Sequence, residues 1–129
     1  TDLFRQTTAA GVEFYGITAD NPYNYFTFRK TSNQPQLTSL VDWPERLLTL
    51  ERFTESLGLN FMLIANTGDA TTSQEFQEQV VEYVQAYRQV GGTPHAYMVQ
   101  SWYSVPTHAL PETNAYTMAN TVLEAQKHF

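Results

Sequence analysis

The chain has 129 residues, of which 42% are hydrophobic and 16% charged, and this size and composition are typical of one folded domain. Seven Lys and Arg against 13 Asp and Glu give a formal net charge of −6. No segment gathers the basic residues, so no nucleic-acid partner is expected, because binding to phosphates depends on a basic surface. The absence of Cys excludes disulfides, a thiol nucleophile and Cys-bound zinc.

No apolar run approaches the ~20 residues that span a bilayer. The first residues also lack the basic and then apolar order of a signal peptide. We therefore expect a soluble chain with no membrane partner. Because it begins with Thr1 in place of Met, we expect it to be processed or to be part of a longer protein.

The first part of the chain is predicted to contain a helix, a strand and a long connection. Residues 1–10 form the helix, which Gly11 ends. Residues 12–19, VEFYGITA, are rich in β-branched and aromatic residues and form the first strand. Residues 20–41 then form a connection with two prolines, in which YFTFR can form a short strand. Loops this long in a compact domain are usually functional or disordered, and the aromatic residues argue against disorder.

Two further helix and strand pairs follow. Asp42 and Glu45 have the spacing of a capping box, and the helix that they begin ends at Gly58. Residues 59–65, LNFMLIA, form a continuous apolar run, which is typical of a strand covered on both faces. A second capping-box spacing, Thr72 with Glu75, begins the next helix.

The last part of the chain repeats the pattern. Gly91 and Gly92 end the preceding helix, and residues 95–102, HAYMVQSW, form the third strand. A final helix starts near Tyr116, with Thr113 or Asn114 as its cap. Strands that alternate with helices predict an α/β fold with parallel strands and right-handed crossovers. Since a (β/α)8 barrel takes ~250 residues, the single domain of residues 1–129 can supply its last three β/α units. A small three-layer α/β sandwich is the alternative.

Functional residues are expected after the three strands, because both architectures bind ligands at the carboxyl ends of parallel strands. Each of these segments contains a carboxylate: Asp20, Asp69 and Glu112. Glycoside hydrolases use two carboxyl groups on opposite sides of a cleft, one as general acid and the other as nucleophile or base. We select Asp20 and Asp69 as the catalytic candidates. The structural alternative for Asp20 and Asp69 is that each side chain forms a hydrogen bond with the backbone of its own turn. Glu112 lies near a helix start, where a negative charge is favourable.

Amide and aromatic side chains are the candidates for substrate binding. Asn66 and Gln100 can form hydrogen bonds with sugar hydroxyls. The structural alternative for Asn66 is to cap the turn that follows the strand. The amide of Gln100 needs hydrogen-bond partners at the strand end in either case. Large aromatic side chains with a polar tip are suited to partly solvated sites, where a sugar ring can stack on the face of the aromatic ring. The rings available for such a platform are Trp102, Tyr103, Tyr23, Tyr25 and Phe26. Some of them can instead close the end of the core.

His108 is a candidate substrate contact or general base, with a solvated loop histidine as the alternative. The three histidines are too far apart in the chain to predict a zinc site. Ser101 and Ser104 lie near His108, but neither has the G-x-S-x-G setting of a nucleophilic serine. No glycine-rich phosphate loop is present, so no cofactor is expected.

The segments VEFYGITADNP, FMLIANTGD and YMVQSWYSVPTHALPETNAYTMANTV together resemble the last three units of glycoside-hydrolase-like (β/α)8 barrels. In such barrels a tryptophan at the end of the eighth strand commonly forms the bottom of the sugar-binding site, and Trp102 matches this position. Many retaining members have a glutamate nucleophile after the seventh strand, where this chain has Asn66. The resemblance implies the barrel and a sugar site more strongly than it implies hydrolysis, and it favours a secreted protein.

Two main functions remain open from the sequence, beside a weaker third one, a small α/β enzyme that acts on another polar metabolite. The first is a carbohydrate-active protein, a glycoside hydrolase or part of one, that acts on a poly- or oligosaccharide. The second is a non-catalytic module derived from a barrel, which assembles with copies of itself or with the missing N-terminal part of the barrel.

Overall fold

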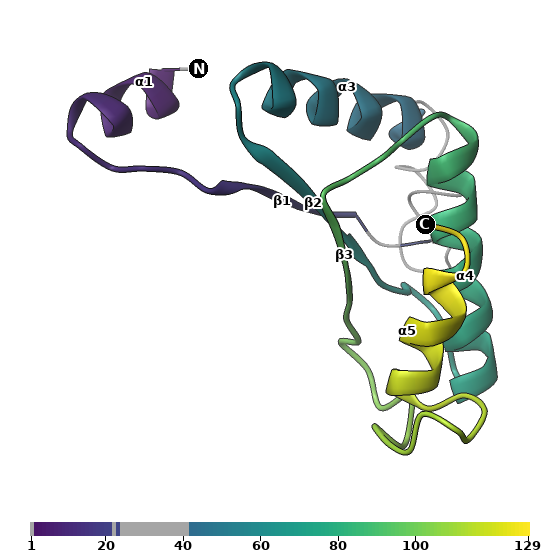
Figure 1. The fold of residues 1–129 in the computed structure, drawn as a ribbon. Coiled ribbons are helices and arrows are strands. Elements are labelled where there is room, and N and C mark those ends of the chain that lie inside the picture. Colours follow the sequence, from purple (N-terminus) through teal and green to yellow (C-terminus); the bar gives the residue numbers. More distant parts are fainter. Residues whose placement is uncertain (1, 22, 24–41) are drawn as a thin grey trace.

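The computed structural model describes residues 2–21, 23 and 42–129. Helices and strands alternate along the chain (Figure 1). Their bounds are α1 Asp2–Ala9, β1 Gly16–Asp20, α3 Trp43–Ser56, β2 Asn60–Ala65, α4 Ser73–Gln89, β3 Ala96–Val99 and α5 Met118–Gln126. The prediction of short strands alternating with helices is therefore confirmed.

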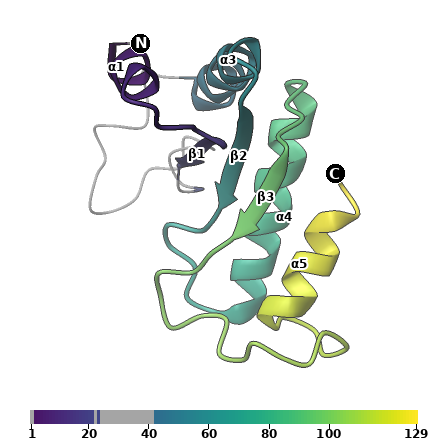
Figure 2. The same ribbon diagram turned by 60° about the vertical axis from the view of Figure 1, so that its left-hand side comes forward.

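The three strands form one parallel sheet in the order β1-β2-β3. Gly16 pairs with Asn60 at one end of the β1–β2 ladder, and Ala65 pairs with Val99 at the other end of β2–β3. Strand order follows chain order, so right-handed crossovers place α3 and α4 on the same face of the sheet. Figures 1 and 2 show α4 and α5 side by side next to β3, with α3 beyond the amino end of β2. The structure is an α/β fold.

Only one face of the central strand is fully covered. In β2 the residues Phe61, Leu63 and Ala65 are buried, whereas the alternate residues Met62 and Ile64 are partly exposed. We expected β2 to be covered on both faces. Among the described residues, one face of β2 is covered and the other is partly exposed. Successive side chains of a strand point to opposite faces, so α3, α4 and α5 cover the odd-numbered face.

The core lies between β2 and the apolar side of α4. The buried α4 side chains recur at helical spacing, and each fully buried one contributes about 1.5–3 kcal/mol relative to exposure. They are Phe76, Val80, Tyr83, Val84 and Tyr87. This helix is thus the main support for the carboxyl end of β2.

The helix boundaries follow the predicted caps in two cases of three. Asp42 caps α3, with its side chain accepting from the Glu45 backbone N–H at 3.2 Å, and Thr72 with Glu75 forms the capping box of α4. The prediction for α5 is wrong, because Thr117 is the cap and the helix starts at Met118. Thr117 Oγ1 accepts from the Asn120 N–H at 3.1 Å.

Two strand boundaries also differ from the prediction. β1 starts at Gly16, not at residue 12, because β2 starts at Asn60 and leaves residues 12–15 without a strand to pair with. β3 ends at Val99, because its partner β2 ends at Ala65. The expected YFTFR strand lies outside the described residues. Among the described helices, none is long and apolar enough to cross a membrane.

Candidate functional site at the carboxyl edge of the sheet

Asp20, Asn66 and Gln100 meet at one edge of the sheet. Asp20 is the last residue of β1, Asn66 follows β2, and the Gln100 N–H donates to the Ala65 carbonyl at 3.2 Å, one step beyond β3. The strands are parallel, so their carboxyl ends lie together. The structure thus brings three sequence-predicted site residues to this edge.

Asp20 is held by Asn66. The Asn66 Nδ2 donates to Asp20 Oδ1 at 2.6 Å, and Asn66 itself is 0% exposed. Asp20 is exposed, and its second oxygen accepts no hydrogen bond from the described residues. Asn66 therefore holds Asp20 in place from a buried position.

Asp69 is held in the same way by Gln79 of α4. The Gln79 Nε2 donates to Asp69 Oδ1 at 2.9 Å, and Gln79 is only 8% exposed. Each of the two candidate carboxylates is thus bound through one oxygen by a buried carboxamide. Sequence reasoning missed Gln79, although its position three residues after Phe76 and four before Tyr83 places a polar residue on an apolar helix face.

Buried oxygens without a partner gather near this edge. Among the described residues, no hydrogen bond reaches Oδ1 of Asn66, Oγ1 of Thr67, Oε1 of Gln79 or Oε1 of Gln100. Buried polar groups are normally bonded, and each exception calls for an explanation. Three of these are carbonyl oxygens, which can only accept, and the Thr67 hydroxyl can accept or donate, so acceptors outnumber donors in the described part of this edge.

Tyr23 lies in the core and is not part of an exposed stacking surface. It is 0% exposed, its hydroxyl donates to Glu82 Oε2 of α4, and its N–H donates to the Asn66 carbonyl at 3.2 Å. These contacts turn the ring inward, which overturns its predicted role as a surface for a sugar. Tyr25 and Phe26 lie outside the described residues.

Trp102 and Tyr103 are exposed in the loop after β3, at 66% and 57%. Ser101 closes a tight turn beneath them, because its Oγ donates to the Val105 carbonyl and accepts from the Tyr103 N–H. The turn thus keeps the Ser101 hydroxyl occupied and presents both rings to solvent. Each exposed ring is accessible for stacking on the apolar face of a sugar.

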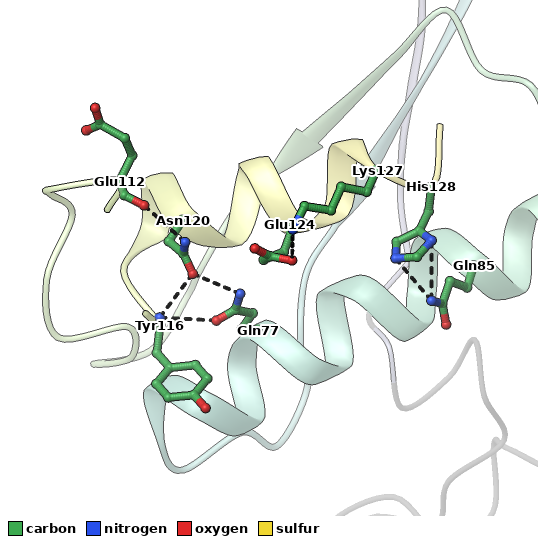
Figure 3. Close-up of polar contacts among 8 residues, drawn as sticks. All are labelled: Gln77, Gln85, Glu112, Tyr116, Asn120, Glu124, Lys127 and His128. Carbon is green, nitrogen blue, oxygen red and sulfur yellow. Dashed lines mark hydrogen bonds and ion pairs between the residues drawn. The ribbon is translucent and has the colours of Figure 1, made fainter. Parts of the chain in front are cut away.

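The long loop from Gln100 to Thr117 is fastened to its neighbours. The Thr107 N–H donates to Ser73 Oγ at the start of α4, at 3.1 Å. Figure 3 shows a second anchor, in which the Tyr116 N–H donates to Gln77 Oε1 at 3.1 Å and the Gln77 Nε2 donates to Asn120 Oδ1 at 3.0 Å. The loop that presents the two rings therefore has a defined shape.

Glu112 and His108 contribute mainly through their backbone. The Glu112 carbonyl accepts from Asn120 Nδ2 at 3.0 Å, and its carboxylate points away from the α4–α5 contact (Figure 3). The His108 carbonyl accepts from the Met118 N–H at 3.0 Å, while its Nδ1 bonds Thr107 Oγ1 at 3.0 Å. His108 is exposed, and its imidazole stays available to solvent.

Burial and the charge of Asp20 affect the pKa of Tyr83, which lies in the core. Burial raises the pKa of Tyr83 well above its usual range, and the charge of Asp20 raises it further. Tyr83 therefore stays neutral at all physiological pH values. The described residues contain no group of three or more His, Asp or Glu side chains that could hold a metal ion.

Comparisons of the chain with protein-family models, with curated proteins and with solved structures found no match.

Proposed function

We propose that the chain forms three β/α units of a (β/α)8 barrel that binds a poly- or oligosaccharide at the carboxyl edge of its strands. Chain-ordered parallel strands with helices on one face are the arrangement of such a barrel, whereas a three-layer sandwich needs helices on both faces. The partly exposed face of β2, with Met62 and Ile64, corresponds to the barrel interior. The resemblance of the three strand ends to glycoside-hydrolase-like barrels supports the same proposal.

The observation that carries the proposal is the pair of anchored carboxylates. Asp20 and Asp69 each use one oxygen to accept from a buried amide and keep the other free of described protein donors. Catalytic and binding groups need such support from residues whose own positions are locked. Trp102 and Tyr103 supply exposed rings in the loop that follows the neighbouring strand.

The proposed chemistry is hydrolysis of a glycosidic bond. One carboxyl group donates a proton to the leaving oxygen, and the other acts as nucleophile or as base toward water. Asp20 and Asp69 are the candidates for these two roles, and the ring of Trp102 binds the apolar face of a sugar. Asn66, which occupies the place of a glutamate nucleophile in many related barrels, acts here by orienting Asp20.

Binding of oligosaccharides to a Trp102→Ala variant tests the proposal. We expect the variant to bind at least about fivefold more weakly, since loss of an aromatic contact costs on the order of 1 kcal/mol or more. Tyr15→Ala is the matched control, because Tyr15 is 67% exposed but precedes β1 at the opposite edge of the sheet. No binding of any glycan, or equal binding by wild type and Trp102→Ala, would remove the proposed function.

A non-catalytic assembly module is the second candidate. It is favoured by the outer edges of β1 and β3, which pair with no other strand among the described residues. Unpaired edges promote pairing with another chain. Light scattering separates the two functions, because an assembly module forms oligomers over the micromolar range without any saccharide.

A further inference from the structure

A groove of about 390 Å³ runs along α4 beside Asp69. Its volume lies within the range of ~300–1,000 Å³ that small-ligand pockets occupy. Asp69, one of the two candidate carboxylates, lines this groove, so the groove adjoins the proposed site. Its described lining residues are Asp69, Thr71, Glu75, Glu78, Gln79 and Glu82.

The groove concentrates negative charge. Glu75, Glu78 and Glu82 recur at a spacing of three and four residues, which places them on one side of the helix. Glu78 accepts from Gln74 Nε2 at 2.8 Å, and Glu75 accepts from the Thr71 N–H and Oγ1 at 2.8 and 2.7 Å. These donors are neutral, and no basic residue stands among the described lining residues.

A second observation points to a missing donor in the same groove. Gln79 lines the groove and is 92% buried, since only 8% of it is exposed. Its nitrogen is used by Asp69, but its carbonyl oxygen Oε1 has no hydrogen-bond partner among the described residues. A buried acceptor without a donor is destabilising, so a ligand that brings a donor relieves it.

We propose that this groove binds a protonated amine of the saccharide, so that the ligand is an oligosaccharide of amino sugars that are not acetylated. A hydroxyl group supplies a donor but leaves the charges of Asp69, Glu75 and Glu78 uncompensated. An ammonium group supplies three donors and a positive charge together. The inference rests on the proposed saccharide site and names its substrate class.

Calorimetric titration with three tetrasaccharides tests the inference. The probes are a glucosamine tetramer, its N-acetylated form and a glucose tetramer, each at pH 6 and low salt. We expect the glucosamine tetramer to bind at least about tenfold more tightly than the other two, because it alone forms charge pairs with the groove. The preference should shrink as salt is raised.

Glu78→Gln should reduce this preference about threefold or more, because it removes one charge from the groove while keeping the side-chain size. Glu78 is exposed on the helix surface, so the variant is expected to fold. Glu55→Gln on α3 is the matched control, since Glu55 is also exposed and is not among the described residues that line this groove. It should leave the preference unchanged.

The outcomes separate this inference from the proposed function. Equal binding of all three tetrasaccharides would overturn the amine subsite and leave the saccharide site standing. Binding of none would remove both. Equal affinity for spermidine and for the glucosamine tetramer would also overturn the inference, because the groove would then bind cations without regard to the sugar.

Discussion

Glu51 is a buried carboxylate that joins three parts of the fold. It lies on α3 and is 1% exposed. Its Oε2 accepts from the Tyr87 hydroxyl of α4 at 2.8 Å, and its Oε1 accepts from the Thr93 N–H at 2.8 Å and from Thr93 Oγ1 at 3.1 Å. Burial, followed by the bond to Glu51, raises the pKa of Tyr87 far above its usual range, so the phenol remains a donor. Three donors compensate the cost of burying this charge.

We expect Glu51→Ala to lower the free energy of unfolding by about 3 kcal/mol or more, because it leaves buried donors without an acceptor. Tyr87→Phe removes one hydrogen bond to a charged group and should cost about 1.5–3 kcal/mol. Urea unfolding measures both values. Glu55→Ala, an exposed change on the same helix, should stay within about 0.5 kcal/mol. A loss for Glu51→Ala no larger than for Glu55→Ala would contradict the structural role of Glu51.

The candidate site was predictable from the sequence to the extent that strand ends mark it. Asp20 and Asn66 directly follow or end apolar strands, so their meeting at one edge follows from parallel pairing. Tyr23 was assigned wrongly, because an aromatic residue in a polar loop carries no local signal of whether it turns inward. The partnership of Gln79 with Asp69 joins a loop to the second turn of a helix and depends on tertiary packing alone.

At the scale of elements, local side-chain chemistry decided most boundaries. The N-caps of α3 and α4 and the glycines at the helix ends are short-range signals, and Gly58 and Gly91 indeed have positive φ values of 72° and 89°. The start of β1 and the end of β3 depend instead on where β2 offers a partner. For α5 three residues of capping type, Thr113, Asn114 and Thr117, compete within five positions, and the contacts of the loop with α4 select Thr117.

The capping box of α4 predicts a pH-dependent contribution to stability. Bonds from Thr71, first from its side chain and then from its backbone, lower the pKa of Glu75 from its usual value of 4.5. A carboxyl whose pKa is lower in the folded state stabilises the fold above the unfolded pKa and loses this effect as the pH falls. Glu75→Gln should therefore lower the melting temperature at pH 7 and lower it less at pH 3. Thermal denaturation at pH 7, 5 and 3 measures this, with Glu55→Gln as control; a difference that does not change with pH would contradict it.

At the scale of the whole molecule, the described structure is one-sided. α4 and α5 pack along the sheet next to β3, and α3 lies near the amino ends of β1 and β2 (Figure 2), where its Leu47 and Leu48 join the same core as Phe61. Met62 and Ile64 of β2, with Met98 of β3 in register with Ile64, lie on the opposite face. Parallel sheets usually have both faces covered. In the proposed barrel, the other strands and their side chains cover this face.

Two Lys substitutions at residues of similar exposure test the barrel. Met98 is 38% exposed on the open face of the sheet, and Leu123 is 44% exposed on the side of α5 opposite the buried Thr121 and Ala125. If the barrel interior covers Met98 in the natural gene product, Met98→Lys buries an unpaired charge and should cost about 2 kcal/mol or more. Leu123→Lys faces solvent in either case and should change stability by no more than about 0.5 kcal/mol. Denaturant unfolding of the natural gene product measures both changes. Equal, small effects would show that solvent reaches the open face, and the barrel would then have to be abandoned in favour of a three-stranded unit.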